Sequence, residues 1–260
     1  MSIAHEVSGR RSIDWDALAE SAQSLALGAR AAVGETWRER MRQEHLAVGA
    51  FAQITQELAA IGCNGVVLAL VARAAADEVR HTETCRRFAV ALLGQDAVPR
   101  GWRGLPDIPR HPGQDASVRA LLHVVEMCCL SETLTGVFFT EMRARASNPT
   151  ARAVVESLLE DEVDHGKVGW AYLADRARSG SIERLAEALP DMLERTFGYA
   201  LQGRGQAEDD EASEAFGYVR EGARAAIFRR ALKDVVVPGF EAVGVDLSPA
   251  RLKLRALLGS

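Results

Sequence analysis

Two segments of this chain, residues 77–81 and 161–165, repeat the five-residue pattern Asp-Glu-Val-x-His. In an α-helix a Glu and a His three residues apart lie on the same face, so each segment can offer a carboxylate and an imidazole to one metal ion. A single Glu-x-x-His pair arises easily by chance, because helices are rich in Glu. Its repetition, with the same Asp in front of each Glu, predicts a site that binds a pair of metal ions.

Long helices must position these pairs, and Ala, Leu, Arg and Glu predominate without a sustained alternation typical of strands. The expected helices cover about residues 15–32, 35–61, 64–93, 115–146 and 150–178. Asn64 is expected to cap the third of them, and Ser147-Asn148-Pro149 to make a tight turn between the last two. The connection from Gly94 to Gln114 is long and contains four prolines and four glycines.

Two helical hairpins joined by one long crossover predict an all-α fold with the connectivity of a ferritin-like four-helix bundle. Residues 1–34 are expected to form an N-terminal tail and a leading helix, and residues 35–178 the bundle. Residues 179–260 are expected to form flanking helices, interrupted by the polar stretch 203–210 and by Pro238. These helices either pack on the bundle, where they would roof a pocket, or form a dimer surface.

If the Glu-x-x-His pairs lie on the second and fourth bundle helices, the first and third should each supply one inward Glu. On the first helix, Glu44 shares a face with the mostly apolar positions Val48, Phe51, Thr55 and Leu58. Glu44 and Glu78 lie 19 and 15 residues from Cys63 at the turn, so they are nearly level. Glu57 points about 140° away, toward solvent, and would miss that level by about 13 Å. Glu44 is therefore the predicted ligand.

On the third helix, Glu132 is the one charged residue of a face whose other members are Leu121, Val125, Cys128, Gly136 and Phe139. It lies 16 residues before Asn148, and Glu162 lies 14 after it, so these two are level as well. The rival, Glu126, points about 120° off that face and lies about 9 Å away along the axis. We place Glu126 outside the set of ligands, within reach of a polar network nearby.

The predicted ligands are Glu44, Glu78, His81, Glu132, Glu162 and His165. Four carboxylates and two neutral imidazoles balance two divalent cations, and these donors suit iron or manganese rather than thiolate-bound structural zinc. Without metal, four carboxylates buried together would repel one another and some would take up protons. The alternative is six ordinary surface residues, but a solvated face would not be lined by Val, Phe and Leu.

These residues resemble the ferritin-like di-iron carboxylate superfamily, and the resemblance covers about residues 35–178, the whole predicted bundle. It is strongest to bacterial ferritin-like domain proteins, whose first helix reads Glu-His-x-x-Val-x-x-Phe, as residues 44–51 do here. Residues 76–81 (Ala-Asp-Glu-Val-Arg-His) and 131–133 (Ser-Glu-Thr) match their second and third helices. The resemblance implies two iron ions, or a manganese and an iron, and says less about a substrate, because most of these relatives have no assigned reaction.

In that superfamily the Asp before each Glu-x-x-His typically hydrogen-bonds a metal-ligating His of the opposite helix, which implies this role for Asp77 and Asp161. Such a carboxylate fixes the tautomer of the imidazole and makes its other nitrogen a better ligand. The alternative for both is a solvated acidic residue. His45, which follows Glu44, faces another direction and is expected to support the site or the fold rather than to bind metal.

Cys85 lies four residues after His81, on the same predicted face. The position resembles that of the radical tyrosine in the radical-generating subunit of ribonucleotide reductase, and bacterial multicomponent monooxygenases have a Cys there. Because no Tyr is present, a stable tyrosyl radical is not expected. We interpret Cys85 as a small core residue near the metals, with a redox participant as the alternative.

The composition, 48% hydrophobic and 26% charged over 260 residues, is ordinary for a soluble globular protein, and the net charge of −5 gives no support for nucleic-acid binding. No apolar run approaches the ~20 residues that span a bilayer, and residues 1–14 lack the apolar core of a signal peptide. The cysteines, Cys63, Cys85, Cys128 and Cys129, have no Cys-x-x-Cys spacing. Free thiols and a cytoplasmic location without a membrane partner are therefore expected.

The leading functional hypothesis is an oxidoreductase in which two ferrous ions supply electrons to dioxygen and a small organic substrate is hydroxylated or desaturated. Dioxygen is then a co-substrate, and an electron donor protein or reductant is a partner. The alternative is an iron-oxidising or iron-storage protein, or a peroxide scavenger, although this chain has no Cys-x-x-Cys pairs for a rubredoxin-type iron site. A binding protein with a vestigial site ranks last, because no ligand position is empty. A homodimer is also considered, since bundles of this class commonly dimerise.

Overall fold

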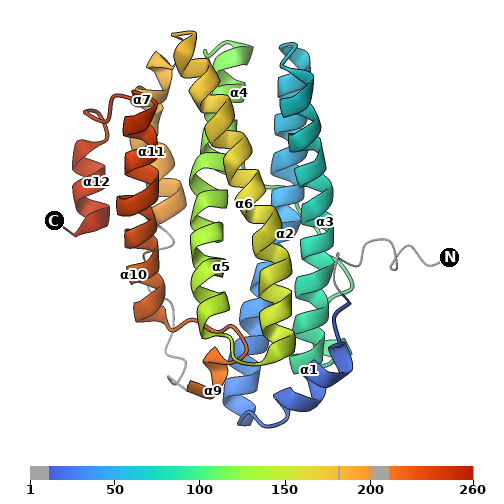
Figure 1. The fold of residues 1–260 in the computed structure, drawn as a ribbon. Coiled ribbons are helices and arrows are strands. Elements are labelled where there is room, and N and C mark those ends of the chain that lie inside the picture. The colour runs from blue at the N-terminus through green and yellow to red at the C-terminus, as the bar shows by residue number, and fades with distance from the viewer. Residues whose placement is uncertain (1–11, 181, 199–200, 202–210, 260) are drawn as a thin grey trace.

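The computed structural model describes residues 12–180, 182–198, 201 and 211–259, and these residues form helices and loops without a strand. The all-α prediction is therefore confirmed for this part of the chain. Four long helices form its centre (Figure 1). They are α2 (Leu27–Ala60), α3 (Gly65–Leu93), the continuous helix of α4 (Ala116–Val124), η3 (Val125–Glu132) and α5 (Thr133–Arg145), and α6 (Pro149–Arg178).

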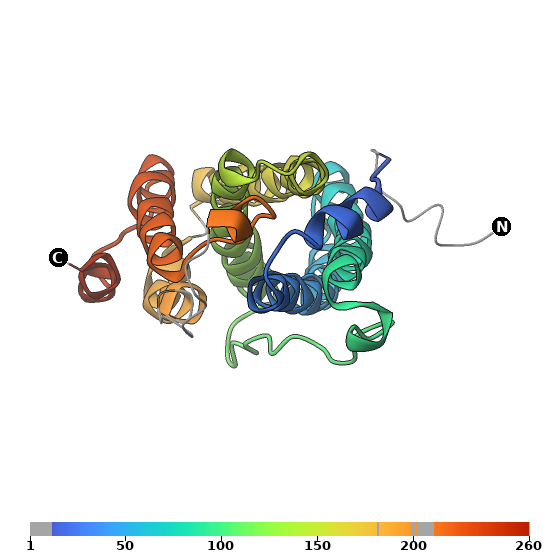
Figure 2. The same cartoon turned by 90° about the horizontal axis from the view of Figure 1, so that it is seen from below.

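The four long helices pack as two hairpins, α2 with α3 and α4–η3–α5 with α6, and α3 packs on α6 while α2 packs on α4. Seen end-on, they enclose a four-sided bundle (Figure 2). The crossover from Gly94 to Asp115, which includes the short η2 (Gln95–Ala97), runs along the outside of α2. It lies close to the helix at Gly49, where a Cβ would come within 2.6 Å of Pro106. The predicted long connection between two hairpins is thus present.

Side chains cap the starts of three of these long helices. Asn64 accepts a hydrogen bond from a backbone N–H of the first turn of α3, as predicted. Asn148 does the same for α6 and Asp115 for α4. Each cap satisfies an N–H group that has no partner inside the helix. The caps therefore determine where α3, α4 and α6 begin. The start of each helix in turn determines the height of its residues along the bundle axis.

The first helix is shorter than predicted, and the first bundle helix is longer. α1 covers Trp15–Ala22, not residues 15–32, and α2 begins at Leu27, eight residues before the predicted start. Near the end of α1, the hydroxyls of Ser21 and Ser24 donate hydrogen bonds to backbone carbonyl oxygens. Such bonds offer the chain an alternative to continued helix. The boundary predicted between the leading segment and the bundle consequently lies inside α2.

Flanking helices follow α6 on one side of the bundle (Figures 1 and 2). They are α7 (Glu183–Leu193), η4 (Glu194–Gly198), α10 (Glu221–Ala231), η5 (Leu232–Val236), α11 (Val237–Ala242) and α12 (Arg251–Leu258), while α9 (Glu211–Glu214) contacts α2. Of these, α7, η4, α10 and η5 pack against α4, η3 and α5. The predicted interruption at Pro238 is wrong, because α10, η5 and α11 are continuous. Pro238 sits in the first turn of α11, directly after the π-helical turns of η5, where its missing N–H is tolerated. The polar stretch 203–210 lies outside the described residues.

One helix of the described ranges, Ala116–Arg145, is long and apolar enough to cross a membrane by length and composition, with a mean hydropathy of 1.4 in its most apolar window. This helix is α4–η3–α5 at the centre of the bundle, and 61% of that window is buried inside the protein. Core helices of soluble proteins have the same properties. The observation is therefore weak evidence for a membrane span.

Candidate metal centre

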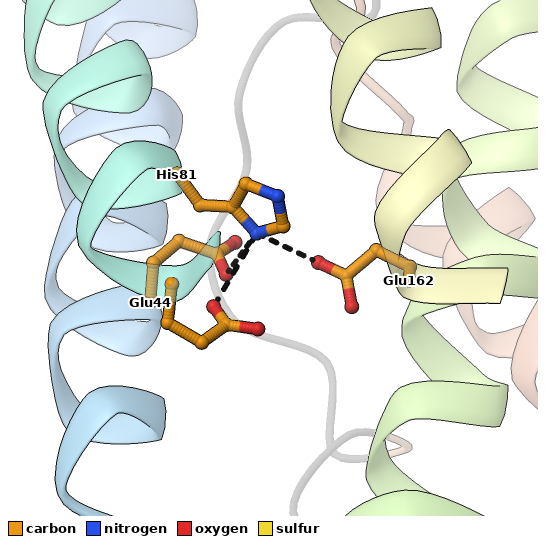
Figure 3. Close-up of side chains that lie close together, drawn as sticks. Glu44, His81 and Glu162 are labelled. Carbon is orange, nitrogen blue, oxygen red and sulfur yellow. Dashed lines mark ion pairs between the residues drawn. The ribbon is translucent and has the colours of Figure 1, made fainter. Parts of the chain in front are cut away.

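The six predicted ligands come together inside the bundle, from all four of its sides. They are Glu44 on α2, Glu78 and His81 on α3, Glu132 at the end of η3, and Glu162 and His165 on α6. All six are buried, with relative exposures between 1% and 5%. Figure 3 shows the carboxylates of Glu44 and Glu162 directed at the ring of His81 from different helices. Side chains far apart in the sequence thus form one compact cluster.

The first group of ligands surrounds His81. Its Nδ1 lies 3.4 Å from an oxygen of Glu78, 3.4 Å from an oxygen of Glu162 and 3.8 Å from an oxygen of Glu44. The ligand atoms of this group all lie within 4.8 Å of one another. Metal–ligand bonds of about 2.0–2.2 Å place the donors around one ion roughly 3–4 Å apart. The group therefore has the dimensions of a single metal position.

The second group of ligands surrounds His165 in the same way. Its Nδ1 lies 3.1 Å from an oxygen of Glu78, 3.6 Å from an oxygen of Glu132 and 3.7 Å from an oxygen of Glu162. These ligand atoms also lie within 4.8 Å of one another. The ring centroids of His81 and His165 are 5.9 Å apart, so the two positions are neighbours.

Glu78 and Glu162 belong to both groups, and their oxygens are divided between them. Oε2 of Glu78 faces His81 and Oε1 faces His165. Oε1 of Glu162 faces His81 and Oε2 faces His165. Such a division suits two carboxylates that bridge two ions, with Glu44 and Glu132 each serving one ion.

The atoms that face the middle of the cluster lack hydrogen bonds. Both oxygens of Glu78 and of Glu162, and Nδ1 of His81 and of His165, are buried and make no hydrogen bond of ordinary geometry. A buried polar group left unpaired costs about 1–3 kcal/mol, and a charged one costs more. So many unpaired acceptors around one point fit metal ions in the place of hydrogen-bond donors. Carboxylate oxygens with imidazole nitrogens are a donor set that suits iron and manganese.

The raised pKa values of two carboxyls in the cluster also fit a site for cations. Burial, followed by the charges of Glu78 and Glu162, raises the pKa of Glu44 well above its ordinary value. Burial, followed by the charge of Glu162, likewise raises the pKa of Glu132. Cations among these carboxyls would oppose both effects and favour the ionised form.

Each imidazole contacts an aspartate of the opposite helix through its other ring nitrogen. His81 Nε2 lies 3.3 Å from Asp161 Oδ2, and His165 Nε2 lies 3.4 Å from Asp77 Oδ2. An acceptor at that distance favours a proton on Nε2 and leaves Nδ1 free to bind a metal ion. The cross-helix contact implied for Asp77 and Asp161 is present, and both residues are buried rather than solvated.

Two arginines of α3, which the sequence pattern did not single out, pair with both aspartates. Arg80 donates to Asp77 Oδ1 at 2.7 Å and also to Asp161 Oδ2. Arg73 lies 3.4 Å from Asp77 and 3.8 Å from Asp161. Burial raises the pKa of Asp77, but hydrogen bonds from His165 and Arg80 outweigh it and hold that pKa below its ordinary range. The signal for Arg80 was available, because it occupies the variable position of the first five-residue pattern.

Glu132 ends a π-helical segment, η3, which the sequence periodicity did not reveal. Hydrogen bonds in a π-helix join residues five apart, so its turns are wider than those of an α-helix. The widened segment lies against Gly169 of α6, where a Cβ would come within 2.3 Å of the Cβ of Cys128. Gly169 therefore permits the close contact between η3 and α6 beside the cluster.

The two carboxylates rejected as ligands have other partners. Glu57 Oε2 lies 2.7 Å from His123 Nδ1, and His123 Nε2 lies 2.7 Å from the carbonyl oxygen of Pro109. The prediction that Glu57 points to solvent is wrong: its side chain is only 19% exposed, because the third helix and the crossover lie over it. Glu126 forms two hydrogen bonds with Arg195 of η4, at 2.6 and 2.9 Å, and so reaches a polar partner outside the cluster, as expected.

Cys85 is fully buried close to the carboxylates. Burial, followed by the charge of Glu44, raises the pKa of its thiol well above the ordinary value. A protonated thiol is a poor nucleophile, which fits a small core residue. All four cysteines are free, as predicted. His45 is half-buried and belongs to neither group of ligands.

A cavity of about 450 Å³ borders the cluster on the side of the C-terminal helices. Glu44, Glu132 and Glu162 form part of its wall. Other wall residues come from α2, the crossover, η3, α5, η4 and α10, among them Phe138 and Phe228. Small-molecule sites commonly enclose about 300–1,000 Å³. The cavity is therefore large enough for a small organic molecule, and three of the six ligands lie in its wall.

No protein-family model, curated protein or solved structure matches this chain.

Proposed function

We propose that this chain is a di-iron carboxylate protein of the ferritin-like class, an O2-activating oxidase or oxygenase that acts on a small organic substrate. The observation that carries the proposal is the division of the oxygens of Glu78 and Glu162 between two groups of buried ligands. Two ferrous ions, or a manganese and an iron, would supply the electrons that reduce dioxygen, and an external donor would replace those electrons.

The residues of the chain would bind and orient the ions. Glu44 and Glu132 would each bind one ion, and the two shared carboxylates would keep both ions close together. Asp161 and Asp77 accept the ring N–H of the opposite imidazole and so direct its Nδ1 inward. The burial of the cluster limits its contact with solvent and strengthens the electrostatic interactions inside it.

The alternative is an iron-oxidising or iron-storage protein, or a peroxide scavenger. The cavity favours the enzyme, because iron oxidation requires a path for ions and peroxide is a very small molecule. Neither needs a space of about 450 Å³ lined in part by Met127, Leu134 and Phe138. An organic substrate beside the ions requires such a space.

Iron binding and oxygen consumption test the proposal. Metal-free protein titrated with ferrous iron in the absence of oxygen should saturate at two ions per chain, as determined by elemental analysis after gel filtration. Exposure to oxygen should then consume a fixed amount of oxygen per chain, and a reductant with a suitable substrate should sustain consumption. Saturation below two ions would contradict the proposed centre.

Iron uptake that continues far beyond two ions per chain in oxygen would support the storage alternative instead. A matched control is Glu57→Ala, which removes a half-buried carboxylate that belongs to neither group of ligands. This variant should bind the same number of ions as the wild-type protein.

A further inference from the structure

The cavity beside the cluster contains three arginines in its wall, Arg40, Arg195 and Arg224. Arg195 is engaged by Glu126 through two hydrogen bonds at 2.6 and 2.9 Å. Arg40 lies one turn before Glu44 on α2, and its Nη1 is 3.5 Å from Glu44 Oε1. The carboxylate partner of Arg40 is therefore itself a predicted metal ligand.

Packing on aromatic rings fixes the position of Arg40. Its guanidinium carbon lies 4.6 Å from the ring centre of Phe139 and 5.3 Å from that of Phe138. Its side chain is only 15% exposed, and its distance to Glu44 is at the outer limit of a hydrogen bond. A guanidinium that stacks on aromatic faces keeps the donors along its edge available for a planar acceptor.

Metal binding would change the charge around Arg40. Glu44 directs Oε1 to Arg40 and Oε2 to His81 at the first metal position. Two divalent ions would balance the four carboxylates of the cluster, and the charge of Glu44 would then be neutralised by the metals. Asp77 and Asp161 are already balanced by two arginines of α3. Arg40 would then have no carboxylate left to balance its charge, and an unbalanced charge in a partly buried position is unfavourable.

We infer that Arg40 binds the carboxylate of the substrate, and that the substrate is a small monocarboxylic acid with an apolar body. The inference rests on the proposed function, because it concerns the same centre with its metals bound. A carboxylate carries the single negative charge that the site needs, and its two oxygens match the fork of a guanidinium. Phe138, Met127 and Phe228 offer apolar surface for the rest of the molecule. An acid anchored at Arg40 would lie one helical turn from Glu44 and so beside the first metal position.

Two probes test this inference without turnover: 3-phenylpropanoate and its uncharged amide, 3-phenylpropanamide. Calorimetric titration of the protein loaded with two ferrous ions, without oxygen, should show the acid binding about ten-fold or more tightly than the amide. In Arg40→Met the affinity for the acid should fall about ten-fold or more, while the affinity for the amide changes little. The matched control, Arg38→Met, removes the same charge from α2 at a residue that pairs with Glu35 and lies outside the cavity wall. It should leave both affinities unchanged.

Three results would overturn the inference: no binding of the acid, equal affinity for acid and amide, or a preference for the acid that survives in Arg40→Met. The last would arise if the acid bound to the metal ions alone. Metal content is measured separately, so a wild-type chain that does not hold two ions contradicts the proposed function, whereas these three results in the two-ion protein contradict only the role of Arg40.

A second variant covers the case in which Arg40→Met loses its metals or fails to fold. Arg40→Lys keeps the charge and the length of the side chain but not the planar fork. The affinity for the acid should fall roughly three- to ten-fold with both ions retained. An unchanged affinity would overturn the inference.

Discussion

Glu78 and Glu162 stand on different helices, α3 and α6, and each presents one carboxylate oxygen to His81 and the other to His165. Neither of the two ligand groups is complete without both of these carboxylates. The two candidate metal positions are therefore coupled through shared side chains, whereas Glu44 and Glu132 each belong to one group.

Removal of a shared carboxylate should affect both ions. We expect Glu78→Ala and Glu162→Ala to reduce the iron content from two ions per chain toward none. Glu44→Ala, Glu132→Ala and His165→Ala should each lose one ion, because each of these residues belongs to one group of ligands and the other group stays complete. Elemental analysis of gel-filtered protein measures the content. Two ions retained in Glu162→Ala would show that this carboxylate is not a shared ligand.

Removal of an aspartate that contacts a ligating imidazole should weaken metal binding without removing a ligand. Asp161→Asn takes away the negative acceptor next to His81 Nε2, so the affinity for iron should fall about 10–100-fold while saturation stays at two ions. Competition with a chelator measures the affinity. Asp164→Asn is the control within the same five-residue pattern, because Asp164 is 55% exposed and pairs with Lys167. Equal affinities of the two variants would contradict the role of Asp161.

Metal binding should release protons, and the affinity should rise with pH. Burial and neighbouring charges raise the pKa of Glu44 and Glu132 above the ordinary value of 4.5 in the metal-free protein. Both carboxyls therefore retain protons at pH values above 4.5, and an arriving cation must displace them. Calorimetric titrations in buffers with different enthalpies of ionisation measure the release. Binding without proton release at a pH just above 4.5, or an affinity that falls as the pH rises, would contradict the assignment.

The pair of Glu57 and His123 should contribute to stability and not to metal binding. His123→Phe leaves the half-buried carboxylate of Glu57 without its partner at 2.7 Å, and the free energy of unfolding should fall by about 1–3 kcal/mol. Denaturant titration measures this change, and the iron content should stay at two ions per chain.

The exposed pair of Arg184 and Glu187 provides a control for that measurement. Glu187 is 63% exposed, and Glu187→Gln should change the free energy of unfolding by no more than about 0.5 kcal/mol. If His123→Phe is as stable as this control, the pair of Glu57 and His123 does not contribute to stability.

The six residues of the cluster were predictable because a helix is a rigid and regular element. Residues at spacings of three and four share a face, and residues equally distant from a tight turn lie at the same level in both arms of a hairpin. Glu44 and Glu132 each share a face with apolar residues of their own helix. Glu44 is level with Glu78, and Glu132 is level with Glu162. Helix ends were predictable where a side chain caps them, as Asn64 does. They were not predictable where Ser21 and Ser24 end α1 early through bonds to carbonyl oxygens.

Periodicity also failed for residues whose partners come from other parts of the chain. It describes the direction of a side chain relative to its own helix, and on that basis Glu57 points to solvent. In the structure the third helix brings His123 to Glu57, and the crossover brings the carbonyl oxygen of Pro109 to His123. The wide turns of η3 and η5 likewise escape a pattern based on the α-helical repeat.

From the sequence alone follow the helical class, the two hairpins with their long connection, and the identity of the six clustered residues, because these depend on local geometry within a helix or across a short turn. The docking of the hairpins and of the C-terminal helices decided the rest. It divided the oxygens of Glu78 and Glu162 between two positions, placed Arg80 between two aspartates and formed the cavity at Arg40. These features are contacts between segments far apart along the chain, and no local spacing encodes such contacts.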